Sequence, residues 1–230
     1  MRHDAAFVSL VSQVRHWLRP GQTELLGMVG LPGAGKSTLA AQLVEALSDV
    51  RAACVSLDDF YLPREERLAR GFPDRGPPGT HDQELLAGFV AQLRARPCQV
   101  ALPVFDRGTE QPLPPRLCKG PLDLCVLEGF LVGIDAPGYE PLRRALDHLI
   151  FVEMEPEAAL AWRRHREATE VAAGRGGMTD AEVQRFWHES LWPQVERFVL
   201  PVRERADVIV SLRADHSLQM VYFPDGTLRN

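Results

Sequence analysis

The residues most suggestive of chemistry form a glycine-rich segment near the start of the chain. Residues Gly30 to Thr38 read GLPGAGKST, which matches the spacing G-x-x-x-x-G-K-[ST] between an apolar run and a helical pattern. Glycines let successive backbone N–H groups curl around phosphates, and a helix N-terminus adds partial positive charge. An ordinary glycine turn is the alternative, and a chance match is expected on the order of once in a hundred chains of this length. The residues expected to bind ATP are Gly30, Gly33, Ala34, Gly35, Lys36, Ser37 and Thr38, with Lys36 at the β- and γ-phosphates.

Carboxylates follow two further apolar runs. Glu128 ends the run before Gly129, and the pair Asp58 and Asp59 ends another. The carboxyl ends of parallel strands meet at one edge of a sheet, where ligands of α/β proteins bind. We expect Glu128 and the Ser37 hydroxyl to hold Mg²⁺, and we assign Asp58 as the catalytic residue that orients the acceptor hydroxyl and takes its proton. Successive side chains of an extended segment point opposite ways, so one member of the Asp pair is expected to face the γ-phosphate.

Two segments rich in proline, glycine and charge interrupt the regular pattern, at Pro63–His81 and Pro103–Gly120. Long irregular segments of compact domains often carry function, so residues 60–82 and 103–120 are expected to form loops on the acceptor side. A carboxylated acceptor would need cationic donors, and a polyol would need acids for its hydroxyls. The residues assigned to the acceptor are Asp59, Tyr61, Arg75, His81, Asp82, Asp106 and Arg107. Surface ion pairing is the alternative for each.

Three arginines lie within one helical turn of the segment 156–178, at Arg163, Arg164 and Arg166. We expect this segment to act as a lid that brings its arginines over the transferring phosphate, with Arg163 as a catalytic residue. The alternative is a solvated helix face on which these arginines pair with neighbouring glutamates.

Alternating apolar and helical patterns indicate the elements that position these residues. Apolar residues at helical spacing predict an N-terminal packing helix over 1–20. The expected strands are Glu24–Val29, Ala52–Leu57, Leu122–Leu127, His148–Met154 and Ala206–Val210. The expected helices are Lys36–Leu47, Asp82–Arg94, Pro156–Ala172 and Thr179–Leu200. Strands that are apolar on both faces and alternate with helices predict a three-layer α/β fold of the P-loop NTPase type. We expect one domain over 1–230, with a mostly parallel five-stranded sheet flanked by helices.

Composition narrows the class of protein. Of the 230 residues, 45% are hydrophobic, and no apolar run approaches the roughly 20 residues that cross a bilayer. The start of the sequence lacks the continuous apolar segment of a signal peptide. We therefore expect a cytoplasmic protein without a membrane partner. The net charge of -5 argues against a nucleic-acid partner. The four cysteines contain no C-x-x-C pair, which disfavours a zinc site or a disulfide framework.

Motifs that are absent favour a kinase among phosphate-binding proteins. The basic residues include only two lysines, Lys36 and Lys119, so the N-K-x-D motif with which GTPases recognise guanine is missing. An L-S-G-G-Q segment like that of transport ATPases is also missing.

The motifs together resemble a known superfamily. The P-loop, the segment Asp58–Tyr61 and Leu127-Glu128-Gly129 resemble the phosphoribulokinase, uridine kinase and pantothenate kinase superfamily. Within it, Arg75–Asp82 (RGPPGTHD) is similar to a segment of D-glycerate 3-kinases, as are Trp162-Arg163 and Gly177–Val183. The resemblance implies a small-molecule kinase that uses ATP and Mg²⁺ to phosphorylate a hydroxyl, with glycerate as the expected acceptor.

Other acceptors stay open at this point. Pro103–Arg107 (PVFDR) resembles a segment shared more widely by uridine-type kinases, which keeps uridine or another small metabolite as an alternative. A regulatory protein that binds nucleotide without turnover is a further alternative.

Overall fold

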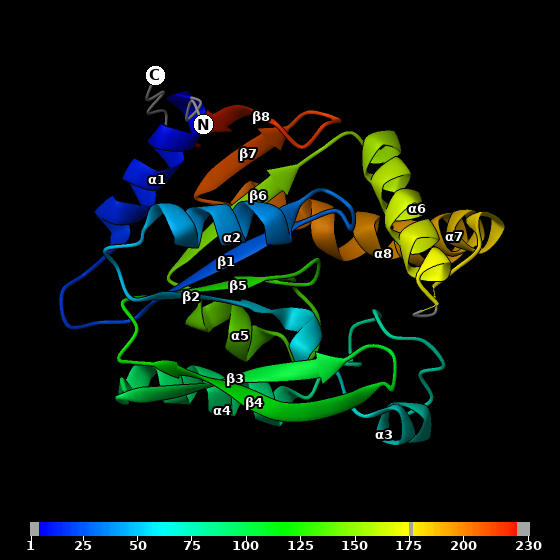
Figure 1. The fold of residues 1–230 in the computed structure, drawn as a ribbon, viewed down its shortest axis with the longest axis horizontal. Coiled ribbons are helices and arrows are strands. Elements are labelled where there is room, and N and C mark those ends of the chain that lie inside the picture. Colours follow the sequence, from blue (N-terminus) through cyan, green and yellow to red (C-terminus); the bar gives the residue numbers. More distant parts are fainter. Residues whose placement is uncertain (1–4, 175–176, 225–230) are drawn as a thin grey trace.

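A computed structural model describes residues 5–174 and 177–224 of the chain. The central sheet has six strands in the order β2-β5-β1-β6-β7-β8, and Figure 1 shows helices on either side of it. The strands are β1 (Glu24–Gly30), β2 (Ala52–Ser56), β5 (Leu124–Glu128), β6 (His148–Glu153), β7 (Val208–Leu212) and β8 (Leu218–Tyr222). All neighbouring pairs are parallel except β7 and β8. The predicted α/β class is therefore confirmed, but the expected count of five strands is wrong.

The core explains why the inner strands were recognisable from sequence. Every residue of β1 and β5 is buried, which is typical of parallel strands covered on both faces. The additional strand, β8, is an edge strand in which Leu218 and Val221 are buried and the other three residues are exposed, and it follows a short turn, so it has no continuous apolar run. It packs against α1 (Ala5–Trp17), the part of the expected N-terminal helix that the structure describes.

Helices connect the strands and cover the sheet. α2 (Lys36–Ala46) follows β1 and contacts β1, β2 and β5, over which it lies in Figure 1. The remaining helices along the chain are α3 (Arg64–Ala69), α4 (Gln83–Ala95), α5 (Glu140–Ala145), α6 (Pro156–Ala172), α7 (Asp180–Phe186) and α8 (Trp192–Gln194). None of the helices in the described ranges is long and apolar enough to cross a membrane.

The segment expected as an irregular loop over 103–120 is instead most of a β-hairpin. β3 (Gln99–Asp106) and β4 (Gln111–Lys119) pair antiparallel as a second, two-stranded sheet, at the bottom of Figure 1. Prolines 112, 114 and 115 hid β4 from sequence analysis, because proline cannot donate to a ladder. β4 tolerates them as an exposed edge strand, and the register shifts around Pro103. The other expected loop, over 60–82, contains the short helix α3.

The helix expected over Thr179–Leu200 is broken into several pieces. Thr179 and Glu182 form a capping box that starts α7, as the sequence favours. Wide π-type turns then flank α8 at Trp187–Leu191 and Val195–Val199, and a tight 3₁₀ segment, Leu200–Arg205, follows. Pro193 lies in α8 and cannot donate to the preceding turn, which accounts for the widening.

Candidate active site

The P-loop lies between β1 and α2, as its motif requires. Gly33 has a φ of +90°, and a Cβ at this position would come 2.2 Å from the Ala159 carbonyl oxygen of α6. A side chain on Gly30 would similarly meet the Val152 carbonyl of β6 at 2.1 Å. Glycine is therefore required at both positions because neighbouring backbones pack directly against the loop.

Lys36 is buried at the start of α2, with its ammonium folded over the P-loop. Its Nζ donates to the carbonyl oxygens of Gly30 and Leu31 at 3.0 and 2.9 Å. Burial lowers the pKa of Lys36 to about 8, and the carboxylates of Glu128 and Asp58 act in the opposite direction. A desolvated cation that is short of negative partners is well suited to bind phosphate oxygens.

The two residues expected to hold Mg²⁺ contact each other. The Ser37 hydroxyl donates to Glu128 Oε1 at 2.9 Å, which joins the start of α2 to the end of β5. Over the described residues, no group of three or more His, Cys, Asp or Glu side chains could hold a metal alone. A hydroxyl beside one carboxylate fits Mg²⁺, which in such sites takes its other oxygens from substrate phosphates and water.

The paired aspartates at the end of β2 have different partners. Both lie in a 3₁₀ turn, Leu57–Phe60, whose start is capped by the Ser56 hydroxyl. Asp58 Oδ2 accepts from Arg107 Nη2 at 2.5 Å, whereas Asp59 Oδ1 accepts from the Phe105 amide at 3.2 Å. Burial raises the pKa of Asp59. Both aspartates therefore contact the hairpin, Asp58 through the Arg107 side chain and Asp59 through the Phe105 amide, and which of them faces the γ-phosphate stays a prediction.

His81 is buried rather than exposed as a cation toward an acceptor. Its Nδ1 shares a hydrogen bond of 2.6 Å with the Tyr139 hydroxyl, and its ring stacks on Tyr61 with centroids 4.4 Å apart. Burial lowers the pKa of His81 to about 4, so the ring is neutral at physiological pH. A neutral His81 supplies shape and hydrogen bonding but no positive charge.

Arg75 and Arg107 lie together where the hairpin meets the segment after α3. Arg75 Nη1 donates to the Arg107 carbonyl oxygen at 3.2 Å. The Arg75 guanidinium lies 6.0 Å from the ring centroids of both Tyr61 and Phe105. Of the expected acceptor residues, Arg107 is the cation that the structure places on Asp58, and Arg75 contacts the backbone of Arg107.

Asp82 and Asp106 stabilise their own segments. Asp82 caps α4 by accepting from the Leu85 amide at 2.9 Å. Asp106 closes the turn of the hairpin, because its carboxylate accepts from the Gly108 amide and the Thr109 hydroxyl. Both contacts are local hydrogen bonds, which differ from the surface ion pairing that the sequence left as the alternative to acceptor binding.

The three arginines of α6 have different partners. Arg163 is mostly buried, with its side chain 12% exposed and its guanidinium 5.1 Å from the Phe186 ring centroid. Burial lowers the pKa of Arg163. Arg166 Nη2 lies 3.6 Å from Glu167 Oε1, and the charge of Arg166 contributes to lowering the pKa of Lys36. Arg164 pairs instead with Asp180 of α7. Residues 175 and 176 of the expected lid lie outside the described residues.

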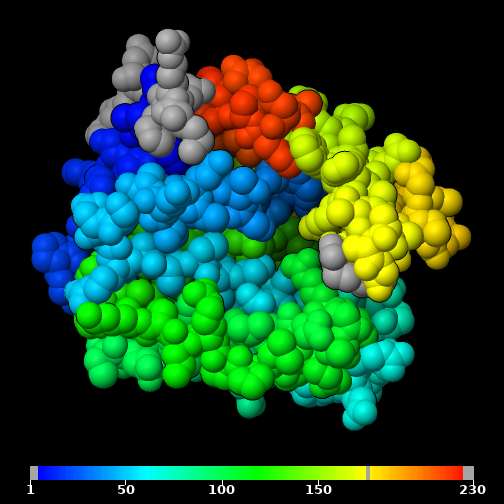
Figure 2. Space-filling view, viewed as in Figure 1, coloured from blue at the N-terminus to red at the C-terminus, as the bar shows by residue number. Residues whose placement is uncertain are grey.

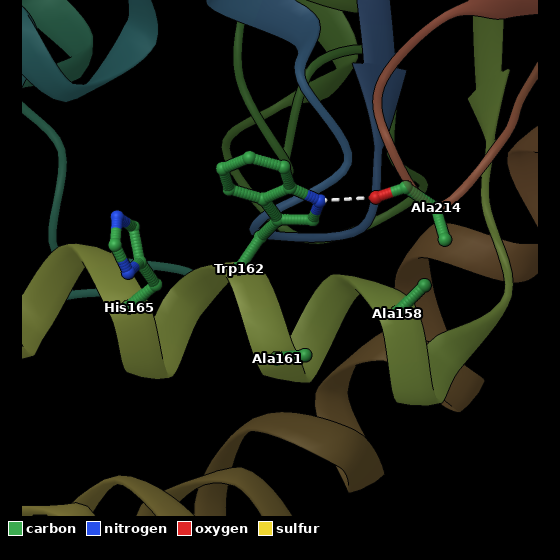
Figure 3. A pocket seen from close by; sticks show the side chains of 5 residues that line it. All are labelled: Ala158, Ala161, Trp162, His165 and Ala214. Carbon is green, nitrogen blue, oxygen red and sulfur yellow. Dashed lines mark hydrogen bonds between the residues drawn. The ribbon is translucent and has the colours of Figure 1, made fainter.

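Sequence analysis did not identify a contact between the turn after β7 and the P-loop. His216 Nε2 contacts the Gly33 carbonyl oxygen at 2.8 Å, and its ring stacks on Trp162 of α6 with centroids 4.3 Å apart. The Trp162 indole donates to the Ala214 carbonyl oxygen, as Figure 3 shows. His216 lies in no recognisable motif and is far from Gly33 in sequence, so only the fold reveals the contact.

A cavity of about 260 Å³ lies beside this contact. Figure 3 shows it lined by the α6 side chains and by the turn, at Ala158, Ala161, Trp162, His165 and Ala214. In the space-filling view, the surface is recessed between α2, the hairpin and α6 (Figure 2). The P-loop precedes α2, Arg107 lies in the turn of the hairpin, and the three arginines of the expected lid lie on α6.

Known proteins are similar to this chain in sequence and in fold. The model of the phosphoribulokinase / uridine kinase family matches residues 25–218. A pantothenate kinase of Psychromonas ingrahamii is 27% identical over 227 residues, which cover 86% of this chain and 70% of that protein. A uridine kinase of Brevibacillus brevis is 26% identical over 195 residues, which cover 83% and 85% of the two chains. The solved structure of a D-glycerate 3-kinase from Cryptococcus neoformans shares the fold, with a TM-score of 0.71, 20% identity and coverage of 94% and 96%.

The family match spans most of the chain, including the P-loop, both strand-end carboxylates and α6. This match confirms the resemblance to the superfamily found in the sequence. The chain therefore belongs to the phosphoribulokinase / uridine kinase family and is a kinase of that superfamily.

Proposed function

We propose that this kinase transfers the γ-phosphoryl group of ATP to a hydroxyl of a small carboxylated metabolite, D-glycerate. The observation that carries the proposal is a pair of neighbouring arginines, one of which holds Asp58. Arg107 bonds directly to this carboxylate, and Arg75 bonds to the Arg107 backbone. An acceptor with a carboxylate and a hydroxyl three or four bonds apart can engage an arginine while its hydroxyl faces Asp58.

Each of the proposed site residues has a role in the phosphoryl transfer. The acceptor oxygen forms a bond to the γ-phosphorus, the bond to the oxygen bridging the β- and γ-phosphates breaks, and ADP leaves. Asp58 takes the hydroxyl proton, and Lys36 stabilises charge on the phosphates. Ser37 and Glu128 would hold Mg²⁺, which neutralises phosphate charge when bound. Kinases of this superfamily in general use ATP and Mg²⁺.

The cavity beside Trp162 is our candidate for the nucleotide base. It adjoins the P-loop through the stacked His216, and its lining is largely apolar, as expected of a site for a planar ring. Trp162 and His165 supply its aromatic walls.

A uridine acceptor is the second candidate, because a uridine kinase is among the relatives. A nucleoside base would need an open aromatic surface. Tyr61, His81 and Phe105 on the acceptor side are buried and pack against one another, which favours the carboxylated acceptor.

An acceptor screen tests the proposal. ADP release is measured with ATP, Mg²⁺ and each of D-glycerate, uridine, pantothenate and ribulose 5-phosphate, with the Asp58→Asn variant as the control. Turnover of D-glycerate that the variant loses would support the proposal. Turnover of uridine alone would overturn the acceptor assignment, and ATP binding without turnover of any acceptor would favour a regulatory protein.

A further inference from the structure

One carboxylate in the hairpin turn contacts three arginines of a separate segment. Glu110 Oε2 lies 2.8 Å from Arg67 Nη2 and 3.3 Å from Arg64 Nε, while Oε1 lies 3.1 Å from Arg75 Nε. The Glu110 carbonyl also accepts from the Arg64 amide at 3.1 Å. Glu110 therefore ties the turn between β3 and β4 to the segment that carries Arg75.

The three arginines differ in environment. The Arg67 side chain is 2% exposed and donates to the backbone carbonyls of Phe72 and Pro73, so it stabilises the segment's shape. Arg64 is 59% exposed, where an ion pair contributes little. Arg75 is partly exposed and lies on the acceptor side, beside Arg107.

The contacts of Arg75 fix its guanidinium plane. Nε lies 3.1 Å from Glu110 Oε1 in an ion pair, and Nη1 donates to the Arg107 carbonyl oxygen. The ion pair and the hydrogen bond leave the Nη2 group of Arg75 to face an acceptor carboxylate. Three guanidinium groups around one carboxylate also leave a net positive charge at this point, which favours an anionic ligand.

The backbone of Glu110 supports a role for its side chain. Its φ of +56° lies in the left-handed region, which is unfavourable for a residue with a Cβ. Glycine would adopt this conformation without strain, so the backbone of the turn does not explain why glutamate is present. Arg107 in the same turn holds Asp58, so the turn carries both an acid for Arg75 and a cation for the proposed base.

We infer that Glu110 is a positioning residue that orients Arg75 toward the anionic group of the acceptor. The inference rests on the proposed function, in which Arg75 binds the acceptor carboxylate. Glu110 itself acts through Arg75 and not on the reacting atoms.

Steady-state kinetics of Glu110→Gln test the inference, with Arg64→Met as the matched control. A hydrogen bond to a charged group contributes enough to change binding about tenfold or more, so the acceptor KM should rise by that factor while the ATP KM stays the same. Arg64→Met removes another arginine from the same carboxylate and should leave both constants unchanged. A Glu110→Gln enzyme with an unchanged acceptor KM would overturn the inference.

The Arg75→Met background separates positioning from a purely structural role. Glu110→Gln also deprives the buried Arg67 of its partner, so its unfolding midpoint should fall in either case. If Glu110 acts through Arg75, adding Glu110→Gln to Arg75→Met should not raise the acceptor KM further. Independent, multiplying effects of the two substitutions would contradict the inference.

Failure of the proposed function has a different signature. If the unaltered chain phosphorylates another acceptor, D-glycerate is wrong and the same comparison is made with that acceptor. If it phosphorylates none of the four, the Arg75 Nε–H resonance of ¹⁵N-labelled protein, assigned by its loss in Arg75→Met, replaces kinetics. This resonance should be protected from exchange in the unaltered chain and in Arg64→Met, and should lose protection in Glu110→Gln. Protection that persists in Glu110→Gln would overturn the inference.

Discussion

Removal of the Lys36 side chain should lower turnover strongly and affect folding little. Its ammonium contacts only loop carbonyls at 3.0 and 2.9 Å among the interactions described, and it is already desolvated. Lys36→Ala removes the cation that strengthens its contact as charge develops on the phosphates, so kcat should fall by about 10²–10³. The measurement is ADP release together with the thermal unfolding midpoint. Lys119→Ala on exposed β4 is the control, and near-native turnover by Lys36→Ala would contradict the P-loop assignment.

The two neighbouring aspartates should respond differently to the same substitution. Asp58→Asn removes the proposed base and should lower kcat by about 10²–10⁴ with little change in the ATP KM. Asp59→Asn keeps an oxygen that can accept from the Phe105 amide, so its effect on turnover should be small. Steady-state kinetics of both variants show which aspartate is the base. The reverse outcome would identify Asp59 as the base.

A methyl group added to Gly33 of the P-loop should push α6 away from the loop. In Gly33→Ala the new Cβ would clash with the Ala159 carbonyl, which lies 2.2 Å from its position, so α6 must shift. We expect the ATP KM to rise at least about tenfold. Gly174→Ala is the matched control, since Gly174 also has a positive φ, and a Cβ there would meet nothing within 4 Å. Equal effects of the two substitutions on the ATP KM would show that backbone strain, and not the contact with α6, is responsible.

Elements with one dominant local signal could be predicted from sequence, and those that depend on distant contacts could not. The inner strands are uniformly apolar, and α6 matches its predicted range of Pro156–Ala172. β4 carries prolines and owes its structure to pairing with β3, so its composition resembles that of a loop. The same division holds in the site. The P-loop is a contiguous motif, whereas the roles of His216 and Glu110 arise from residues brought together by the fold.

At the scale of the whole molecule, charge is distributed unevenly. The net charge is -5, yet positively charged Arg75, Arg107 and Arg166 belong to the segments around the P-loop and Asp58. An anionic acceptor and ATP can be drawn to such a local field although the protein is acidic overall. Net charge therefore bears on the class of macromolecular partner, and the local arrangement bears on the substrate.

Folding stability should depend on pH through buried His81. Its pKa falls from 6.5 in the unfolded chain to about 4 in the fold because burial disfavours the charged ring. Between these values the unfolded state binds more protons than the folded state, so stability is retained above pH 6.5 and declines as the pH falls toward 4. The difference corresponds to at most about 3 kcal/mol in the free energy of unfolding. Urea denaturation between pH 4 and 7 should show a shallower loss of stability for His81→Gln than for the unaltered chain. Identical slopes for His81→Gln and the unaltered chain would show that His81 titrates alike in the folded and unfolded states.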